Sequence, residues 1–305
     1  MPLNHAYIRF FSACIIISFV ITCLIGLLPL SSDECHCDSD TVRTDGRNGK
    51  FADFSDKLQK SSKKKLAVLV PFRDRFEELL TFAPHITSFL NNQGIPHQIF
   101  VLNQVDRFRF NRASLINVGF LYTKAQYDYI AMHDVDLLPI NEQLLYEYPE
   151  HGPFHVASPE LHPKYHYQTF VGGILLVKRE HFQQMNGMSN KYWGWGLEDD
   201  EFYVRIKDAG LRVTRPVNVT TGTSNTFLHI HDRAHRKRDT TKCFNQREIT
   251  RKRDRQTGLD TIKYAISDTK MLTIDDAKVI VLNIKLSCDK AVTPWCDCSG
   301  SGDVN

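Results

Sequence analysis

The sequence has little net charge and lacks the common nucleotide-binding signatures. Its 305 residues include 38 Lys and Arg against 35 Asp and Glu, so the formal net charge is only +3. This balance is too even to indicate DNA or RNA as a partner. A G-x-G-x-x-G fingerprint and a P-loop are both missing, which disfavours a dinucleotide enzyme or a P-loop NTPase. No internal repeat is present.

One long stretch lacks charged residues altogether. Phe10 to Leu30 is rich in Ile, Leu, Phe and Val. About 20 apolar residues cross a bilayer as a helix. A cleaved signal peptide is the alternative, because Ser31-Ser32 offers a weak cleavage site, but its apolar core is normally shorter. We therefore favour an uncleaved membrane anchor.

The charges around this span predict its orientation. Arg9 precedes the span, and acidic residues follow it, which places the N-terminus in the cytosol and the rest of the chain in the lumen. We expect residues 1–9 to form a cytosolic tail and residues 10–30 the transmembrane anchor. Residues 31–64 are polar and cannot bury a core, which is typical of a stem. The folded domain then spans residues 65–305.

Four cysteines of the predicted lumenal part lie in its last quarter. An even number of cysteines in an oxidising compartment indicates two disulfides. Three pairings are possible and the sequence does not choose among them; we expect Cys243–Cys298 with Cys288–Cys296. A zinc site is the alternative, but no paired C-x-x-C spacing supports it. Asn218-Val219-Thr220 is an N-glycosylation sequon, which a lumenal protein can carry.

Apolar periodicity predicts an α/β domain. Short apolar runs indicate strands at residues 66–70, 97–102, 129–132 and 171–177, and helical spacing indicates helices at residues 76–92, 112–125 and 198–209. Pro84 is expected to weaken or kink the first helix. Alternating strands and helices are typical of sheets that bind ligands beyond the carboxyl ends of their strands. After Arg233 the sequence is basic and irregular.

Two segments are candidates for metal binding. Asp134-Val135-Asp136 follows an apolar strand, and its carboxylates suit Mg²⁺ or Mn²⁺, although such a sequence also ends strands as a simple turn. In His229-Ile230-His231 the two imidazoles point to the same side if the segment is extended. One buried and one exposed histidine is the alternative. Histidine together with carboxylate favours Mn²⁺ over Mg²⁺.

A third segment suits a carbohydrate. Trp193-Gly194-Trp195-Gly196 places two large aromatic faces between glycines, and such faces stack on sugar rings. Four acids, Glu198 to Glu201, follow at the start of a helix, where the helix dipole favours an ionised carboxylate. An ionised carboxylate there suits a general base. A hydrophobic anchor followed by ordinary helix-start acids is the alternative. Tyr165-His166-Tyr167 offers two further rings for a sugar site or for the core.

Together these segments resemble the β-1,4-galactosyltransferase family from about Leu66 onward. The matching motifs occur in the family's order: Pro71-Phe72-Arg73-Asp74-Arg75, Phe110-Asn111-Arg112, Asp134-Val135-Asp136, Phe170-Val171-Gly172-Gly173, and Trp193-Gly194-Trp195-Gly196 with its acids. The resemblance implies a single GT-A type, Rossmann-like catalytic domain behind a signal-anchor in the Golgi membrane. It also implies UDP-galactose as donor, Mn²⁺ as cofactor and inversion. His229-Ile230-His231 and Tyr165-His166-Tyr167 resemble the members that galactosylate xylose on proteoglycan core proteins.

The resemblance also implies roles for individual residues. Asp199 is the expected catalytic base, and the expected Mn²⁺ ligands are Asp136, His229 and His231. The expected acceptor-binding residues are Tyr165, Tyr167, Trp195, Leu197, Glu198 and Asp200. The expected UDP-galactose-binding residues are Pro71, Phe72, Arg73, Asp74, Arg75, Phe110, Asn111, Arg112, Asp134, Val135, Asp136, Tyr165, Trp195 and Arg238. The family closes a loop around the tryptophan, for which Gly194, Gly196 and Gly222 are plausible hinges.

Three other functions fit parts of the pattern. The first is a related transferase that uses UDP-N-acetylgalactosamine as donor or terminal N-acetylglucosamine as acceptor. The second is a lumenal lectin or scaffold that has kept the fold without the activity. The third is a hydrolase with paired carboxylates, which the anchor and the nucleotide-type loop disfavour.

Overall fold

The computed structural model describes residues 64–231 and 236–300. The predicted cytosolic tail, the predicted anchor and all of the predicted stem except Lys64 lie outside these residues. No helix within the two described ranges has the length and apolar character needed to cross a bilayer.

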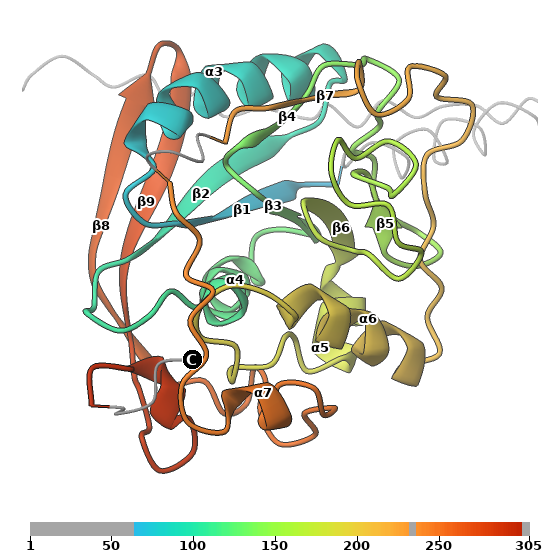
Figure 1. Ribbon diagram of the computed structural model, residues 1–305. Helices are drawn as coiled ribbons and strands as arrows, with labels where there is room; N and C mark the ends of the chain where they lie inside the picture. Colours follow the sequence, from blue (N-terminus) through green and yellow to red (C-terminus); the bar gives the residue numbers. More distant parts are fainter. Residues whose placement is uncertain (1–63, 232–235, 301–305) are drawn as a thin grey trace, which may run out of the picture. The chain divides into compact units, whose positions relative to one another are not determined.

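A seven-stranded mixed sheet forms the centre of the domain (Figure 1). Its order is β5-β6-β3-β1-β2-β9-β8. The strands are β1 (Leu66–Phe72), β2 (His97–Gln104), β3 (Tyr129–His133), β5 (Phe154–His155), β6 (Ile174–Lys178), β8 (Tyr264–Ile274) and β9 (Ala277–Leu286). β1, β2, β3 and β9 are parallel to their neighbours in this group, whereas β5, β6 and β8 run antiparallel to the strands beside them.

Each face of the sheet has its own apolar core. Val68 and Val70 of β1 pack with α3 (Phe76–Asn92) on one face, and Ala67 and Leu69 pack with α4 (Arg112–Thr123) on the other (Figure 1). This alternation follows from the pleat of a strand that is buried on both sides. Because β1 and β3 are parallel neighbours, their carboxyl ends bring residues 73–75 and 134–136 to the same edge of the sheet.

The smaller elements complete the site-bearing half of the domain. β4 (Leu137–Pro139) and β7 (Phe227–His229) form a separate two-stranded antiparallel sheet. The remaining helices are α5 (Arg179–Gln184), α6 (Glu198–Asp208), α7 (Gln246–Ile249) and a 3₁₀ turn at Pro294–Cys296. α6 carries four acids in its first turn and Arg205 and Lys207 in its last, as the helix dipole favours.

α3 spans the predicted residues 76–92 as one helix that includes Pro84. The other elements predicted from periodicity are confirmed, with two corrections. The strand predicted at 171–177 begins only at Ile174, because Gly173 has a φ of +73° and ends any extended run there. The chain after Arg233 is not irregular throughout, since residues 264–286 form the β8–β9 hairpin and β9 pairs with β2.

Two disulfides join the last quarter of the domain. They link Cys243 to Cys298 and Cys288 to Cys296, which confirms the expected pairing over the zinc alternative. Trp295 lies within the loop that each of these bridges closes and is almost fully buried.

Candidate active site

A cleft of about 780 Å³ opens at the carboxyl ends of β1 and β3. Most of the residues that the sequence singled out line it, from seven separate segments. These lining residues are Pro71, Arg73, Asp74, Arg75, Phe110, Arg112, Asp134, Val135, Asp136, Tyr165, Tyr167, Trp195, Leu197, Glu198, Asp199, Asp200, His229, His231 and Arg238.

Two predicted nucleotide-binding residues do not line the cleft. The ring of Phe72 packs in the core between the sheet and α3. Asn111 is fully buried at the start of α4, where its side chain accepts a hydrogen bond from the backbone N–H of Ser114 and donates one to the carbonyl of Asn190. Packing and helix capping therefore account for these two residues.

The β4–β7 ladder assembles the predicted metal ligands. Leu137 pairs with His229, and the backbone N–H of Ile230 donates to the carbonyl of Asp136 at 2.9 Å. The side chains of His229 and His231 then lie on the same side, with ring planes 10° apart and centroids 5.7 Å apart. The prediction that both imidazoles face one way is confirmed.

The three side chains suit a divalent cation in chemistry and nearly in geometry. Oδ2 of Asp136 lies 3.1 Å from Nδ1 of His231 and 3.8 Å from Nε2 of His229. Two ligands of one ion, each bonded at about 2.1 Å and at right angles, stand about 3 Å apart, which the first distance meets. The second distance, between Asp136 and His229, is wider than this. Within residues 64–231 and 236–300, no three such side chains form a closed metal shell.

The charge states of these groups also suit metal binding. Burial lowers the pKa of His229 and of His231, against the opposing effect of Asp136. Both imidazoles are therefore neutral near pH 7 and keep a lone pair free for a cation. Burial, and then the nearby Asp134, raises the pKa of Asp136. A bound cation would offset that effect, because it favours the ionised carboxylate.

A buried arginine connects the metal end of the cleft with the acids of α6. The guanidinium of Arg112 lies 2.8 Å from Asp134 and 3.9 Å from Glu198. Asp134 is thus engaged by Arg112 rather than by the two histidines. This contact agrees with a supporting role for Asp134 and leaves Asp136 as the carboxylate that faces His229 and His231.

Asp199 lies deep in the cleft at the first turn of α6. Burial, followed by repulsion from Glu198 and Asp200, raises the pKa of Asp199 to about 8. The expectation that the helix dipole keeps this carboxylate fully ionised is therefore wrong. Desolvation and like charges outweigh the dipole, which contributes at most about 2 kcal/mol. A pKa near the working pH is nevertheless what a general base requires.

The two tryptophans of the Gly-Trp-Gly segment have different environments. Trp193 is only 3% exposed and packs in the core, so the prediction that both rings offer faces to a sugar is wrong for this residue. Trp195 is 45% exposed and lines the cleft. Gly194, Gly196 and Gly222 all have positive φ, as suits hinge positions, but hinge motion stays a prediction.

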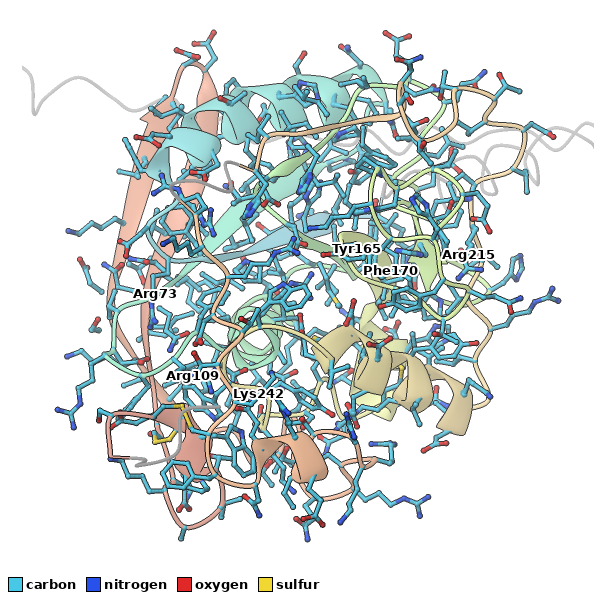
Figure 2. The ribbon with its side chains drawn as sticks, in the orientation of Figure 1. Arg73, Arg109, Tyr165, Phe170, Arg215 and Lys242 are labelled. Carbon is cyan, nitrogen blue, oxygen red and sulfur yellow. A yellow bond between two sulfur atoms is a disulfide. The ribbon has the colours of Figure 1, made fainter. Side chains whose placement is uncertain are left out.

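Arg238 links Trp195 to the tyrosines. Its guanidinium lies 4.6 Å from the centroid of the Trp195 ring and donates to the hydroxyl of Tyr165 at 2.7 Å. Tyr165 and Tyr167 both contact the ring of Phe170 (Figure 2). These residues form an aromatic and cationic wall of the same cleft that Asp199 lines.

The two arginines after β1 differ in what they can still bind. Arg73 donates to the carbonyls of Gln104, Asp106 and Phe108, so most of its donors hold the loop before α4. Arg75 makes one ion pair with Glu78, at 3.2 Å. Of the two, Arg75 has more donors available for a phosphate.

Three residues shape the cleft through contacts that the sequence did not reveal. His162 accepts hydrogen bonds from the backbone N–H groups of Lys164 and Tyr165, and so fixes the turn that carries Tyr165. Arg109 lies beneath Gly194, and Gly172 lies against Asp199. Gly172 belongs to the motif at residues 170–173 and Arg109 directly precedes the motif at residues 110–112, but their partners are distant in the chain and gave no local signal.

Comparisons with known proteins agree with this arrangement. A family profile described as the N-terminal domain of galactosyltransferase matches residues 152–231, and one described as the N-terminal region of glycosyl transferase group 7 matches residues 41–149. β-1,4-Galactosyltransferase 7 of Drosophila melanogaster is 71% identical over 238 residues, which are 78% of this chain and 74% of that protein. Xylosylprotein 4-β-galactosyltransferase of Caenorhabditis elegans is 50% identical over 237 residues, covering 76% and 82% of the two chains.

A solved structure also matches this chain over most of its length. It is the crystal structure of a mutant of the Drosophila β-1,4-galactosyltransferase 7 in complex with manganese, UDP-Gal and xylobiose. The TM-score is 0.77 at 70% identity, and the match covers 77% of this chain and 100% of that one.

Proposed function

Because this chain belongs to the β-1,4-galactosyltransferase family, we propose that it transfers galactose from UDP-galactose to the 4-hydroxyl of xylose on proteoglycan core proteins. The fold is the mixed α/β GT-A type, and the cofactor is Mn²⁺. One observation carries the assignment of the site: a single cleft joins the Asp136–His229–His231 set to Asp199. A lectin needs neither group in that position.

The donor half of the cleft holds the charges that a nucleotide diphosphate requires. Asp136, His229 and His231 would hold Mn²⁺, and the bound cation would neutralise charge that develops on the departing diphosphate. Arg75 and Arg238 line the same cleft, where their charges act on His231, and both are placed to bind phosphate oxygens. Phe110 and Val135 supply the apolar walls for the uridine.

Asp199 is the base in this proposal. Its carboxylate takes the proton from the acceptor hydroxyl as that oxygen attacks the sugar carbon, and one displacement inverts the anomeric centre. Glu198 and Asp200 flank Asp199 and share the cleft wall, where they are placed to accept hydrogen bonds from the sugar hydroxyls.

The acceptor half is aromatic. Trp195 presents a half-exposed ring, and Tyr165, Tyr167 and Leu197 complete the wall. Pyranose rings stack on such faces through their C–H groups. The relatives that are 71% and 50% identical to the chain include an enzyme named for xylosylprotein as its acceptor, which favours xylose over N-acetylglucosamine.

A screen of donors and acceptors tests this function. Purified enzyme with Mn²⁺ is offered UDP-galactose or UDP-N-acetylgalactosamine, together with a β-xyloside or a β-N-acetylglucosaminide. We expect product only from UDP-galactose and the xyloside. Transfer to the N-acetylglucosaminide instead would establish the alternative acceptor, and absence of transfer with every pair would refute the enzyme.

We also propose that residues 65–305 face the lumen behind an anchor at residues 10–30. The support is the apolar span, the disulfides Cys243–Cys298 and Cys288–Cys296, and the sequon at Asn218, which is exposed at a bend. In sealed microsomes the domain should resist added protease until detergent is present. Digestion without detergent would place it on the cytosolic side. The Asn218→Gln variant should also lose a glycosidase-sensitive mobility shift.

A further inference from the structure

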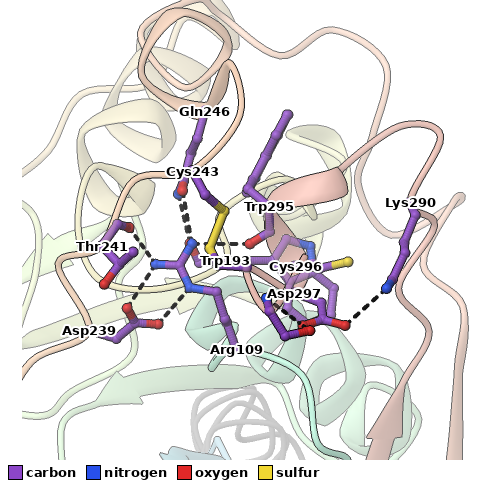
Figure 3. The surroundings of a disulfide bond; sticks show 12 residues. Arg109, Trp193, Asp239, Thr241, Cys243, Gln246, Lys290, Trp295, Cys296 and Asp297 are labelled. Atoms are coloured by element: carbon purple, nitrogen blue, oxygen red, sulfur yellow. Dashed lines mark hydrogen bonds and ion pairs between the residues drawn. A yellow bond between two sulfur atoms is a disulfide. The ribbon is translucent and has the colours of Figure 1, made fainter. Parts of the chain in front are cut away.

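Arg109 is a buried arginine for which the proposed function assigns no role. Its side chain is only 9% exposed, yet it reaches the floor of the cleft. All five of its N–H donors are used, and the acceptors belong to three segments that are 130 or more residues further along the chain (Figure 3). Such a complete set of contacts holds the guanidinium in one position.

One arm of this guanidinium binds Asp239 in a fork. Nε donates to Oδ2 at 2.7 Å and Nη2 donates to Oδ1 at 2.9 Å. Nη2 also donates to the carbonyl of Thr241 at 2.6 Å. The other arm, through Nη1, donates to the side chain of Gln246 at 2.9 Å and to the carbonyl of Trp295 at 3.0 Å. Arg109 therefore joins the cleft segment to the disulfide-bonded tail.

Asp239 transmits this restraint to the aromatic wall. Its backbone carbonyl accepts the N–H of Trp195 at 2.8 Å. Its sequence neighbour Arg238 stacks on the Trp195 ring and donates to Tyr165. Asp239, which Arg109 holds, therefore fixes the backbone of Trp195. Arg238, whose guanidinium stacks on the Trp195 ring, directly precedes Asp239 in the chain.

Gly194 fits against the same guanidinium. A Cβ added at Gly194 would stand 2.0 Å from Nη2 of Arg109, and the residue already has a φ of +81°. The N–H of Gly194 donates to the carbonyl of Phe110 at 2.8 Å. The chain therefore passes directly over Arg109 before it reaches Trp195, and only glycine leaves room for both.

We propose that Arg109 is a positioning residue that acts through Asp239. The Arg109–Asp239 pair fixes the positions of Trp195 and Arg238 relative to each other. The indole that stacks on the sugar and the guanidinium that binds phosphate then point into the same cleft. This inference rests on the proposed function. It predicts that loss of the pair raises the KM for both donor and acceptor, although Arg109 contacts neither the metal ligands nor Asp199.

The test compares Arg109→Lys, Asp239→Asn and the double variant in the full-length enzyme. Each single change should lower kcat/KM about 10- to 100-fold, with higher KM for both UDP-galactose and the xyloside. The kcat/KM of the double variant should be no lower than that of the less active single variant, because both changes remove the same contact. Additive losses would overturn the proposal.

Asp297→Asn is the matched control. Asp297 lies beside the same disulfide cluster and pairs with Lys290 at 2.9 Å (Figure 3), but it accepts none of the side-chain hydrogen bonds of Arg109 and does not line the cleft. This variant should keep wild-type kcat/KM. If it loses as much activity as Asp239→Asn, the tail as a whole rather than the pair sets the rate.

Hydrogen exchange gives a readout that does not depend on activity. The amide of Trp195 should exchange at least about 10-fold faster in Asp239→Asn than in the wild type, while amides of β1 and β3 stay unchanged. Equal protection of Trp195 in both proteins would refute the proposal even if transfer falls. A wild-type enzyme that transfers to no acceptor would instead refute the proposed function and leave the exchange result to decide the role of Arg109.

Discussion

The carboxylate of Asp199 rests against the backbone of Gly172. A Cβ built at Gly172 would stand 2.6 Å from Oδ2 of Asp199 and 2.6 Å from Cε2 of Phe170, closer than any normal contact. The loop before β6 therefore forms one wall of the pocket for the base, and that wall has no room for a side chain.

Gly172→Ala should displace Asp199 and lower kcat/KM about 100-fold, because a shift of about 1 Å at a reacting group has an effect of this size. Steady-state kinetics with UDP-galactose and a xyloside measure it. Gly300→Ala, where an added methyl group meets nothing within 4 Å, is the control. Wild-type activity in Gly172→Ala would show that the pocket adjusts without moving the base.

Asp199→Asn should abolish transfer, with a loss of at least about 1,000-fold, and should leave UDP binding intact. The same change should raise the free energy of unfolding at pH 7.5 by about 1–3 kcal/mol. The unfolded carboxyl ionises near pH 4, whereas the folded one keeps its proton to about pH 8, so folding is disfavoured increasingly between these values.

Turnover, calorimetric UDP titration and denaturant unfolding separate the two effects. Asp208→Asn at the exposed end of the same helix is the matched control and should change neither transfer nor UDP affinity. Full turnover in Asp199→Asn would remove Asp199 from the role of base.

The rate should rise with pH through about 8. A base must be deprotonated, and the pKa of Asp199 is raised to about 8 by burial and by Glu198 and Asp200. Since kcat/KM reports groups of the free enzyme, its logarithm should climb with a slope of one below that pH and level off above it. A profile measured from pH 6 to 9.5 that stays flat would contradict this assignment.

His231→Ala should weaken Mn²⁺ binding by at least about 100-fold, because loss of even a supporting partner costs a metal site 10- to 100-fold. The Mn²⁺ dependence of transfer and a direct Mn²⁺ titration of the apo-protein measure it. His151→Ala removes an exposed histidine outside the cleft and should leave the affinity unchanged. Equal Mn²⁺ affinities in the wild type and in His231→Ala would exclude His231 from the metal shell.

The two disulfides should contribute unequally to stability. Cys243–Cys298 spans 55 residues and Cys288–Cys296 spans 8. Loop-closure entropy gives about 4 kcal/mol for the first and about 2.5 kcal/mol for the second. Paired Cys→Ala variants and denaturant unfolding measure both. If the short bridge proves the more stabilising, chain entropy does not determine their contributions.

Local patterns predicted the elements that form around short-range contacts. β1, α3, β2, α4, β3 and α6 each carry their own periodicity, and their bounds agree with the sequence to within a few residues. β8 was not predicted because it is an exposed edge strand with little apolar alternation. β9 was not predicted either, although residues 279–282 form an apolar run. The pairing of β9 with β2 joins residues about 180 apart, which no local window contains.

The candidate site also combines features that are visible in the sequence with contacts that are not. The chemistry of Asp136, His229 and Asp199 was visible as residue types, but the contacts that position them were not. Asp136 meets His229 only through the β4–β7 ladder. The pKa of Asp199 depends on how deeply the helix start is enclosed, and sequence gives no measure of that. Trp193 and Trp195 look equivalent in the sequence and separate only when the core forms.

The position of β9 inside the sheet also bears on how the protein is made. β2 carries the apolar run Ile99 to Leu102, and one edge of that strand pairs only with residues 279–284. During translation this edge stays open while some 180 further residues emerge from the ribosome. Open apolar edges invite pairing with other chains. The nascent chain therefore carries this exposed edge until the β8–β9 hairpin arrives, and a chain truncated before Ala277 lacks the strand that covers it.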